Sequence, residues 1–224
     1  MISPSSKGAE LITGMKLELD EFLTRWEALP GLKNAELIEG VVYVSSSVGQ
    51  DHGRYEHFLS GWLWLYAEAT LGCDSGNNVS CTMLGQSPQP EIYLRIAEGF
   101  GGKLVPPGKL LAVVPELVVE ISVTSGEIDL GPKLALYRRA GVQEYITIQA
   151  LLERIVWRVL EDGRYRDIQP DSQGILRSKS FPGLWLDTAA YWAGDRRRMR
   201  QTLNLGLETV EHQEFVELLR QRAK

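Results

Sequence analysis

The sequence predicts an α/β fold, and a β-α-β unit over residues 117–148 is the strongest indication of it. Residues 117–123 form a short apolar run, typical of a strand that is buried on both faces. A helical segment follows, Gly141 ends it, and the β-branched segment VQEYITI forms the next strand. The chain has 224 residues, of which 44% are hydrophobic and 24% are charged, so its composition is that of one globular domain.

One acid, Glu120, interrupts the apolar run of the first strand. Alternation along a strand puts Glu120 and Ser122 on one face, and Val119 and Ile121 on the other. An ionised carboxylate is costly to bury unless it is paired or binds a metal. Glu120 is therefore a candidate functional residue. Lys133, near the start of the following helix, is expected to approach it at the end of the strand.

Hydrophobic periodicity and turn residues predict the remaining elements. We expect residues 1–14 to be a flexible leader, and residues 15–224 to form a single domain that closes with a C-terminal helix. The expected elements are helices at 18–29, 53–72 and 203–222, strands at 79–84, 89–94 and 181–186, and a hairpin that turns at 161–164. Residues 35–46 are expected to form either a strand pair or one long strand, with a turn or a bulge at Glu39-Gly40.

Charge and composition exclude some classes of protein. The net charge of −5 argues against a dedicated high-affinity nucleic-acid binder, which is usually basic. It does not exclude an enzyme that acts on nucleic acid, because clustered active-site acids contribute to the total. We expect a cytoplasmic protein, since no apolar run could span a bilayer and the N-terminal segment has no signal-peptide core. Cys73 and Cys81 lack metal-ligand spacing and are predicted to be small buried thiols.

Three acids and a lysine are the candidate site residues. Glu91 and Glu120 stand in apolar strand contexts, and Glu36 begins the strand segment ELIEG. Carboxylate oxygens are the ligands that Mg²⁺ and Mn²⁺ prefer. Lys133 could position a water or stabilise the charge that builds on a phosphoryl group. Together these residue types suit metal-assisted chemistry on a phosphate substrate.

Each candidate also has an ordinary structural interpretation. Glu91 could pair at a strand edge, and Glu36 could be an exposed strand acid. Lys133 is expected to face solvent, so that its removal would leave the fold nearly intact. His52 and His57 are interpreted as a helix-start residue and a surface residue rather than catalytic bases.

Several motifs in order carry a resemblance to a known family. They are Pro90-Glu91, PELVVEIS around Glu120, and DLGPKLALYRRAGVQEY at 129–145, with weaker matches at ELIEGVVY, His52-Gly53 and FPGLWL. From about Met15 to Leu207 the chain resembles the Uma-type putative restriction endonuclease family of the PD-(D/E)XK nuclease superfamily. The resemblance implies a restriction-endonuclease-like fold, with a central mixed β-sheet flanked by helices.

The resemblance further implies a Mg²⁺- or Mn²⁺-dependent endonuclease, which hydrolyses DNA with a metal-activated water. Position by position, Glu91 and Glu120 match the metal-binding acids, and the Ile121 carbonyl matches a backbone ligand. Lys133 matches the catalytic lysine that moved from strand to helix, and Glu36 matches a further catalytic acid. Because enzymes that cut both strands are commonly dimers, we expect a homodimer.

Two positions depart from the family's pattern. Glu91 stands where the family normally has Asp, and Ser122 stands where the superfamily's strand lysine would be. With the net negative charge, they motivate an alternative, a catalytically inactive nuclease-fold module that binds nucleic acid or a protein partner. Convergence of Glu91, Glu120 and Lys133 in the structure is the first requirement of the nuclease interpretation.

Overall fold

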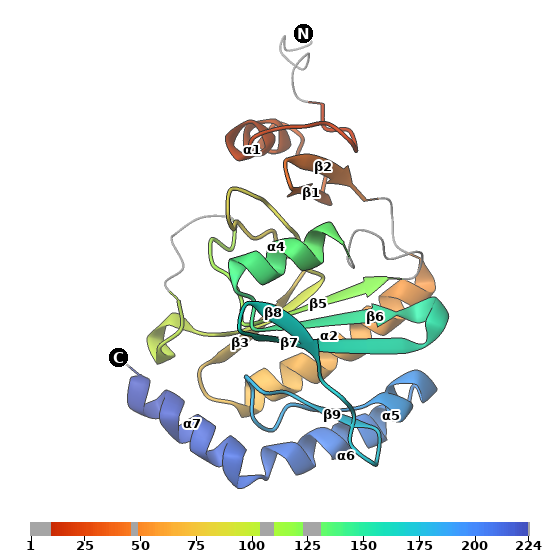
Figure 1. Ribbon diagram of the computed structural model, residues 1–224, viewed down its shortest axis with the longest axis vertical. Helices are drawn as coiled ribbons and strands as arrows, with labels where there is room; N and C mark the ends of the chain where they lie inside the picture. The colour runs from red at the N-terminus through yellow and green to blue at the C-terminus, as the bar shows by residue number, and fades with distance from the viewer. Residues whose placement is uncertain (1–9, 46–48, 104–109, 123–130, 224) are drawn as a thin grey trace.

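The computed structural model describes residues 10–45, 49–103, 110–122 and 131–223, and its centre is a six-stranded mixed sheet. β5 and β6 run parallel, and the other neighbouring pairs of this sheet are antiparallel. This confirms the expected α/β fold with a central mixed sheet (Figure 1). In spatial order the strands are β3 (Cys73–Asn77), β4 (Ile92–Ile96), β5 (Leu117–Ser122), β6 (Glu144–Gln149), β7 (Arg154–Glu161) and β8 (Arg164–Asp167).

The predicted β-α-β unit is present as β5, α4 (Pro132–Ala140) and β6. Proline in the first turn suits a helix start, and Gly141 ends the helix with a φ of 83°, a conformation that favours glycine. All six residues of β5 are buried. Val119 and Ile121 belong to one core cluster and Val118 to another, so the side chains alternate between the faces as predicted.

Helices cover the two faces of the sheet differently. α4 lies on one face, and α2 (Gln50–Ala69) lies on the other (Figure 1). Three C-terminal helices, α5 (Thr188–Ala193), α6 (Arg196–Leu207) and α7 (Val210–Arg222), pack beyond α2. Among the described residues, no helix combines the length and the apolar character that crossing a membrane requires.

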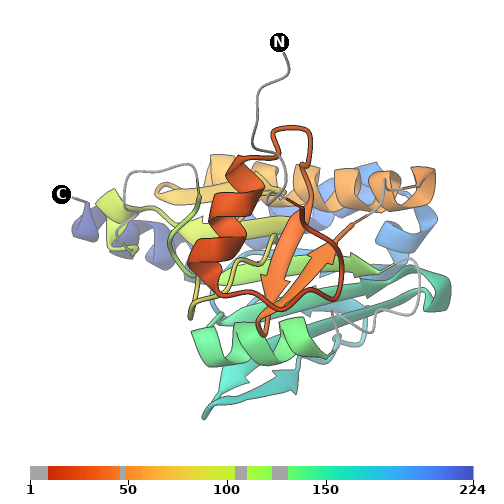
Figure 2. The same cartoon turned by 90° about the horizontal axis from the view of Figure 1, so that it is seen from above.

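The N-terminal part forms a smaller cluster of its own, with α1 (Leu19–Glu27) beside a hairpin of β1 (Ala35–Ile38) and β2 (Val41–Val44) (Figure 2). The hairpin turns at Glu39 and Gly40, both with positive φ, which resolves the segment 35–46 as a strand pair. Residues 1–9 of the expected leader lie outside the described residues. Leu11 is buried in this cluster.

Several predicted boundaries were wrong. The expected C-terminal helix is two helices, because Asp195 and Thr209 each accept a backbone N–H and start a helix. The strand expected at 181–186 is β10 (Trp185–Asp187), which pairs with the unpredicted β9 (Ile175–Arg177). β3 begins at Cys73, before the strand expected at 79–84. Two short 3-10 helices, η1 (Glu98–Phe100) and η2 (Ala150–Leu152), complete the described elements.

A buried carboxylate joins the central sheet to the segment before β10. Glu144, at the start of β6, accepts hydrogen bonds from the Trp157 indole at 2.7 Å and from the Ser178 hydroxyl at 2.9 Å. It also accepts the backbone N–H groups of Lys179 and Ser180 at 2.7 and 2.6 Å. Burial raises the pKa of Glu144, and these four donors oppose that increase.

We expect Glu144→Ala to lower the free energy of unfolding by about 3–5 kcal/mol, because it leaves four donors without their acceptor. Urea unfolding at neutral pH measures the change. Glu214→Ala, at an exposed position of α7, is the matched control and should change stability little. Equal stability of the two variants would contradict the role of Glu144.

A second buried polar contact holds α7 against α2. His212 Nδ1 lies 2.9 Å from the Leu207 carbonyl, and Nε2 lies 3.0 Å from Thr70 Oγ1. A neutral ring satisfies both contacts when Nδ1–H donates to the carbonyl and Nε2 accepts from the hydroxyl. Burial lowers the pKa of His212, and the bond to Leu207 partly opposes this. The docking of α7 therefore favours the uncharged histidine.

This pKa shift predicts a pH dependence of stability. Because the unfolded chain binds a proton on His212 at higher pH than the folded chain, the stability that neutral His212 contributes declines as the pH falls below about 6.5. The stability difference between the parent and His212→Gln should therefore shrink on acidification. Urea unfolding at several pH values measures it, with exposed His57→Gln as the control. Parallel curves for the parent and His212→Gln would refute the assignment.

Candidate active site

Three of the predicted site residues meet beneath α4. Glu120 projects from β5 towards α4, and Lys133 is the second residue of that helix. The Lys133 ammonium lies 3.0 Å from Glu120 Oε1 and 2.9 Å from Oε1 of Glu36, which belongs to β1. The lysine thus bridges carboxylates from two segments that are far apart in the sequence.

All three side chains are withdrawn from solvent, with exposures of 1% for Glu120, 4% for Lys133 and 8% for Glu36. The expectation that Lys133 faces solvent was wrong. α4 packs directly on the sheet, and the hairpin of β1 and β2 covers the end of the helix where Lys133 lies.

Two further groups hold the carboxylates in place. The Tyr137 hydroxyl donates to Glu120 Oε1 at 2.8 Å, and the Gln89 N–H donates to Glu36 Oε1 at 2.6 Å. Burial raises the pKa of Tyr137 well above its ordinary value, and the two carboxylates add to the increase, so the hydroxyl keeps its proton. Tyr137 was not among the candidate site residues. Its spacing of four from Lys133, which puts both on one helix face, was the available signal.

Glu91 lies directly before β4, the strand that neighbours β5. The ladder between β4 and β5 ends with the pair Ile92 and Val119, so extending the register by one residue places Glu91 opposite Glu120. Glu91 Oε2 accepts the backbone N–H of Ile121 at 2.7 Å. Glu91 therefore sits at the edge of β5 where the predicted backbone ligand lies.

His52 is a site residue that the sequence interpretation missed. It lies in the first turn of α2, and its Nε2 is 2.9 Å from Glu91 Oε1. The expectation of a helix-start residue is confirmed, and the side chain, which is 12% exposed, also contacts Glu91. Periodicity gives no signal for such a contact, because it joins a helix start to a strand that lies about forty residues later.

The donor chemistry of this edge suits a hard cation. In a strand, the N–H and C=O of one residue point to the same side, so the Ile121 carbonyl points towards the side where Glu91 binds its N–H. Two carboxylates and a carbonyl are oxygen donors of the kind that Mg²⁺ and Mn²⁺ take. The described residues contain no cluster of three His, Cys, Asp or Glu arranged to hold a metal ion. Lys133 and His52 contact the carboxylates instead.

The nearby thiol is not a reactive group. Cys81 is fully buried, and burial raises its pKa to about 12, with Glu120 and Glu36 adding to the increase. A thiol that keeps its proton at neutral pH is a poor nucleophile. Cys73 is half-buried and also unpaired by any disulfide, and burial raises its pKa to about 12. The expectation of small buried thiols is confirmed for Cys81, whereas Cys73 is only partly buried.

Comparison with known proteins identifies the family. Residues 19–189 match the family Uma2, described as putative restriction endonuclease. The chain belongs to the Uma2 family. This confirms the resemblance that the motifs around Glu120 and Lys133 carry. No curated protein matches the chain.

A solved structure supports the same fold for this Uma2 chain. The crystal structure of a putative nuclease belonging to DUF820 from Anabaena variabilis is similar, with a TM-score of 0.64 and 17% sequence identity. The match covers 79% of this chain and 98% of that one. At this level of sequence identity, the match shows that the two proteins share a fold.

The bridging lysine should be essential to stability. We expect Lys133→Met to lower the free energy of unfolding by about 3–5 kcal/mol, since it keeps the aliphatic stem but removes the ammonium that contacts two buried carboxylates. Adding Glu36→Gln should recover part of the loss, because it removes one uncompensated charge. Urea unfolding of the single and double variants measures both effects.

Arg139→Met is the matched control for this prediction. Arg139 is on the same helix and pairs with Glu39 at 3.1 Å, but both side chains are about half exposed. Its loss should change stability by less than about 1 kcal/mol. If Lys133→Met is as mild as Arg139→Met, the lysine does not neutralise buried charge in solution.

Proposed function

We propose that this protein is a metal-dependent DNA endonuclease that hydrolyses phosphodiester bonds. The observation that carries the proposal is the convergence of Lys133, Glu36 and Glu120 beneath α4, beside the edge where Glu91 binds Ile121. Family membership supports a nuclease, because Uma2 is described as a putative restriction endonuclease family. We further propose a single domain that acts as a cytoplasmic homodimer, since cutting both DNA strands suits two copies.

Each residue has a proposed task. Glu91, Glu120 and the Ile121 carbonyl would hold Mg²⁺ or Mn²⁺, which when bound lowers the pKa of a coordinated water. The Lys133 ammonium supplies a positive charge beside Glu120. This charge would stabilise the negative charge that develops on the phosphoryl oxygens. Glu36 positions Lys133 through its 2.9 Å contact.

His52 and Tyr137 act as positioning residues in this proposal. His52 holds one oxygen of Glu91, and Ile121 N–H holds the other, so that carboxylate has a defined orientation. Tyr137 holds Oε1 of Glu120. Carboxylates that are oriented in advance lose less conformational freedom when a substrate and a cation bind.

Plasmid cleavage tests the proposal. The parent should nick or cut plasmid DNA with Mg²⁺ or Mn²⁺ and not with EDTA, and Glu120→Gln should lose roughly a hundredfold or more in rate. The cleavage rate of Glu91→Gln should fall similarly, since this substitution removes a proposed metal ligand. Glu39→Gln, at the surface turn after β1, is the control and should cut like the parent.

The cleavage assay also distinguishes a catalytic role of Lys133 from its role in stability. Lys133→Arg keeps the charge that neutralises the buried carboxylates but changes its shape and reach. It should retain more stability than Lys133→Met while still losing most of the cleavage rate. A Lys133→Arg variant that folds well and cuts like the parent would contradict the assignment of Lys133 as the catalytic cation.

A second candidate function is favoured by one feature of the site. Lys133 and His52 already contact the acids, as in a site that is neutralised within the chain. A nuclease-fold module that binds nucleic acid without cleaving it accounts for this feature. Fluorescence anisotropy with labelled duplex, read beside the cleavage assay and Mn²⁺-dependent melting, distinguishes the two. DNA binding without cleavage and without a Mn²⁺-induced rise in melting temperature would favour the module.

A further inference from the structure

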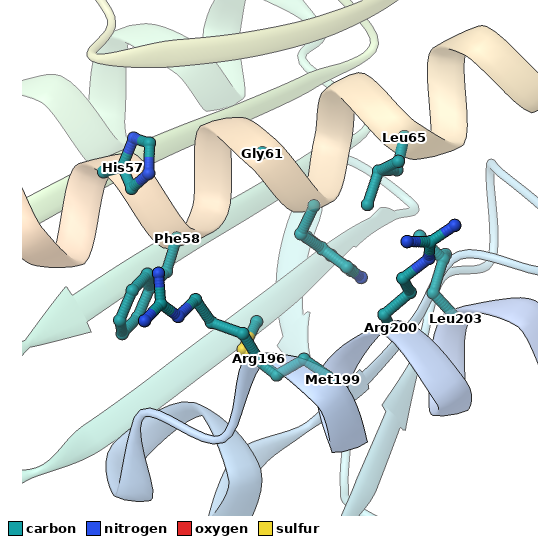
Figure 3. Close-up of a pocket in the computed structure, with 9 residues that line it drawn as sticks. His57, Phe58, Gly61, Leu65, Arg196, Met199, Arg200 and Leu203 are labelled. Carbon is teal, nitrogen blue, oxygen red and sulfur yellow. The ribbon is translucent and has the colours of Figure 1, made fainter.

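A cavity between α2 and α6 lies apart from the candidate active site. Its volume is about 210 Å³, and Figure 3 shows side chains of both helices converging on it. It belongs to the α2 side of the sheet, whereas Glu120 and Lys133 lie on the α4 side. Its lining is apolar in the interior and basic at the edge, and consists of His57, Phe58, Gly61, Trp62 and Leu65 from α2 and Arg196, Met199, Arg200 and Leu203 from α6.

Two arginines at the edge of the cavity are available to bind an anion. Arg196 and Arg200 are exposed and one helical turn apart, and neither has a carboxylate partner among the described residues. Arg198 of the same run differs, because it pairs with Asp187 at 2.6 Å. The nearby acid Asp195 is engaged as the cap of α6, where it accepts the Arg198 N–H. The cavity therefore opens beside two available guanidinium groups, in a chain whose net charge is −5.

The aromatic side chains define where an apolar body would lie. The Arg196 guanidinium carbon is 5.7 Å from the centre of the Phe58 ring, and that of Arg54 is 5.8 Å from the same ring. Figure 3 shows Arg196 reaching towards Phe58, with Arg200 at the opposite end near Leu65. The Trp62 indole N–H already donates to the Trp185 carbonyl, so Trp62 requires no polar ligand.

Gly61 lies at the exposed edge of the cavity. Gly61 is in the interior of α2, and a Cβ built there meets nothing within 4 Å. Glycine inside a helix costs about 0.5–1 kcal/mol relative to alanine, so stability alone would favour a larger residue. Gly61 is among the residues that line the cavity, and the open space around its Cβ position leaves room for a larger side chain at the cavity opening.

We propose that this cavity binds a small monoanion with one ring-sized apolar body, whose acid group is held by Arg200. The size argues for a single substituted ring, because a cavity of roughly 150 Å³ accommodates benzene. It is too small for the face of a partner helix, which needs a groove several turns long. Guanidinium groups recognise carboxylates with directed, charge-assisted hydrogen bonds. This site is independent of the proposed nuclease activity.

Isothermal titration of the full chain with benzoate and with neutral benzamide tests the charge requirement. We expect saturable binding of the acid at one site, roughly tenfold or more tighter than binding of the amide. Arg200→Gln should remove that preference. Arg197→Gln, exposed in the same run but not lining the cavity, should keep it.

Gly61→Leu tests the location. It should obstruct the cavity opening and abolish binding of both probes, while the melting temperature stays at or above that of the parent. Gly53→Ala, also in α2 with an open Cβ position but outside the cavity, should bind like the parent. If the parent binds neither probe, binds both equally, or still binds after a folded Gly61→Leu substitution, the proposal is wrong.

Discussion

The structure around the site depends on the compensation of buried charge beneath α4. Glu120 interrupts a strand that is otherwise apolar, and its carboxylate is almost fully withdrawn from water. Such a group persists because Lys133 and Tyr137 both contact Oε1. Lys133 in turn binds Glu36, so one ammonium ties together α4, β5 and β1. The N-terminal hairpin is thereby attached to the central sheet at the candidate site.

The two faces of the central sheet have different roles. The α4 side holds the charged cluster, and β5 contributes Glu120 to it. The α2 side holds the larger apolar core, and Val119 and Ile121 of the same strand contribute to it. Glu91 lies between the two, because its carboxylate binds the edge of β5 and contacts His52 at the start of α2. A strand with two-residue alternation can thus serve a polar site and an apolar core together.

Much of this could be predicted from local pattern. The β-α-β unit, the alternation around Glu120, and the hairpins that turn at 39–40 and 162–163 follow from periodicity and from turn residues. The assignment to the Uma2 family also followed from motifs, and the family comparison confirms it. The division of the C-terminus into α6 and α7 did not, because Asp195 and Thr209 become caps only in their folded context.

The sequence by itself determined the architecture and the choice of Glu36, Glu91, Glu120 and Lys133 as candidates, since an acid in an apolar strand has few ordinary explanations. Only the tertiary structure decided how they meet. Burial of Lys133 depends on the packing of α4 against the sheet and on a hairpin about a hundred residues earlier in the chain. The contact between His52 and Glu91 likewise joins α2 to the end of β4. Such contacts depend on long-range packing, and local periodicity carries no information about them.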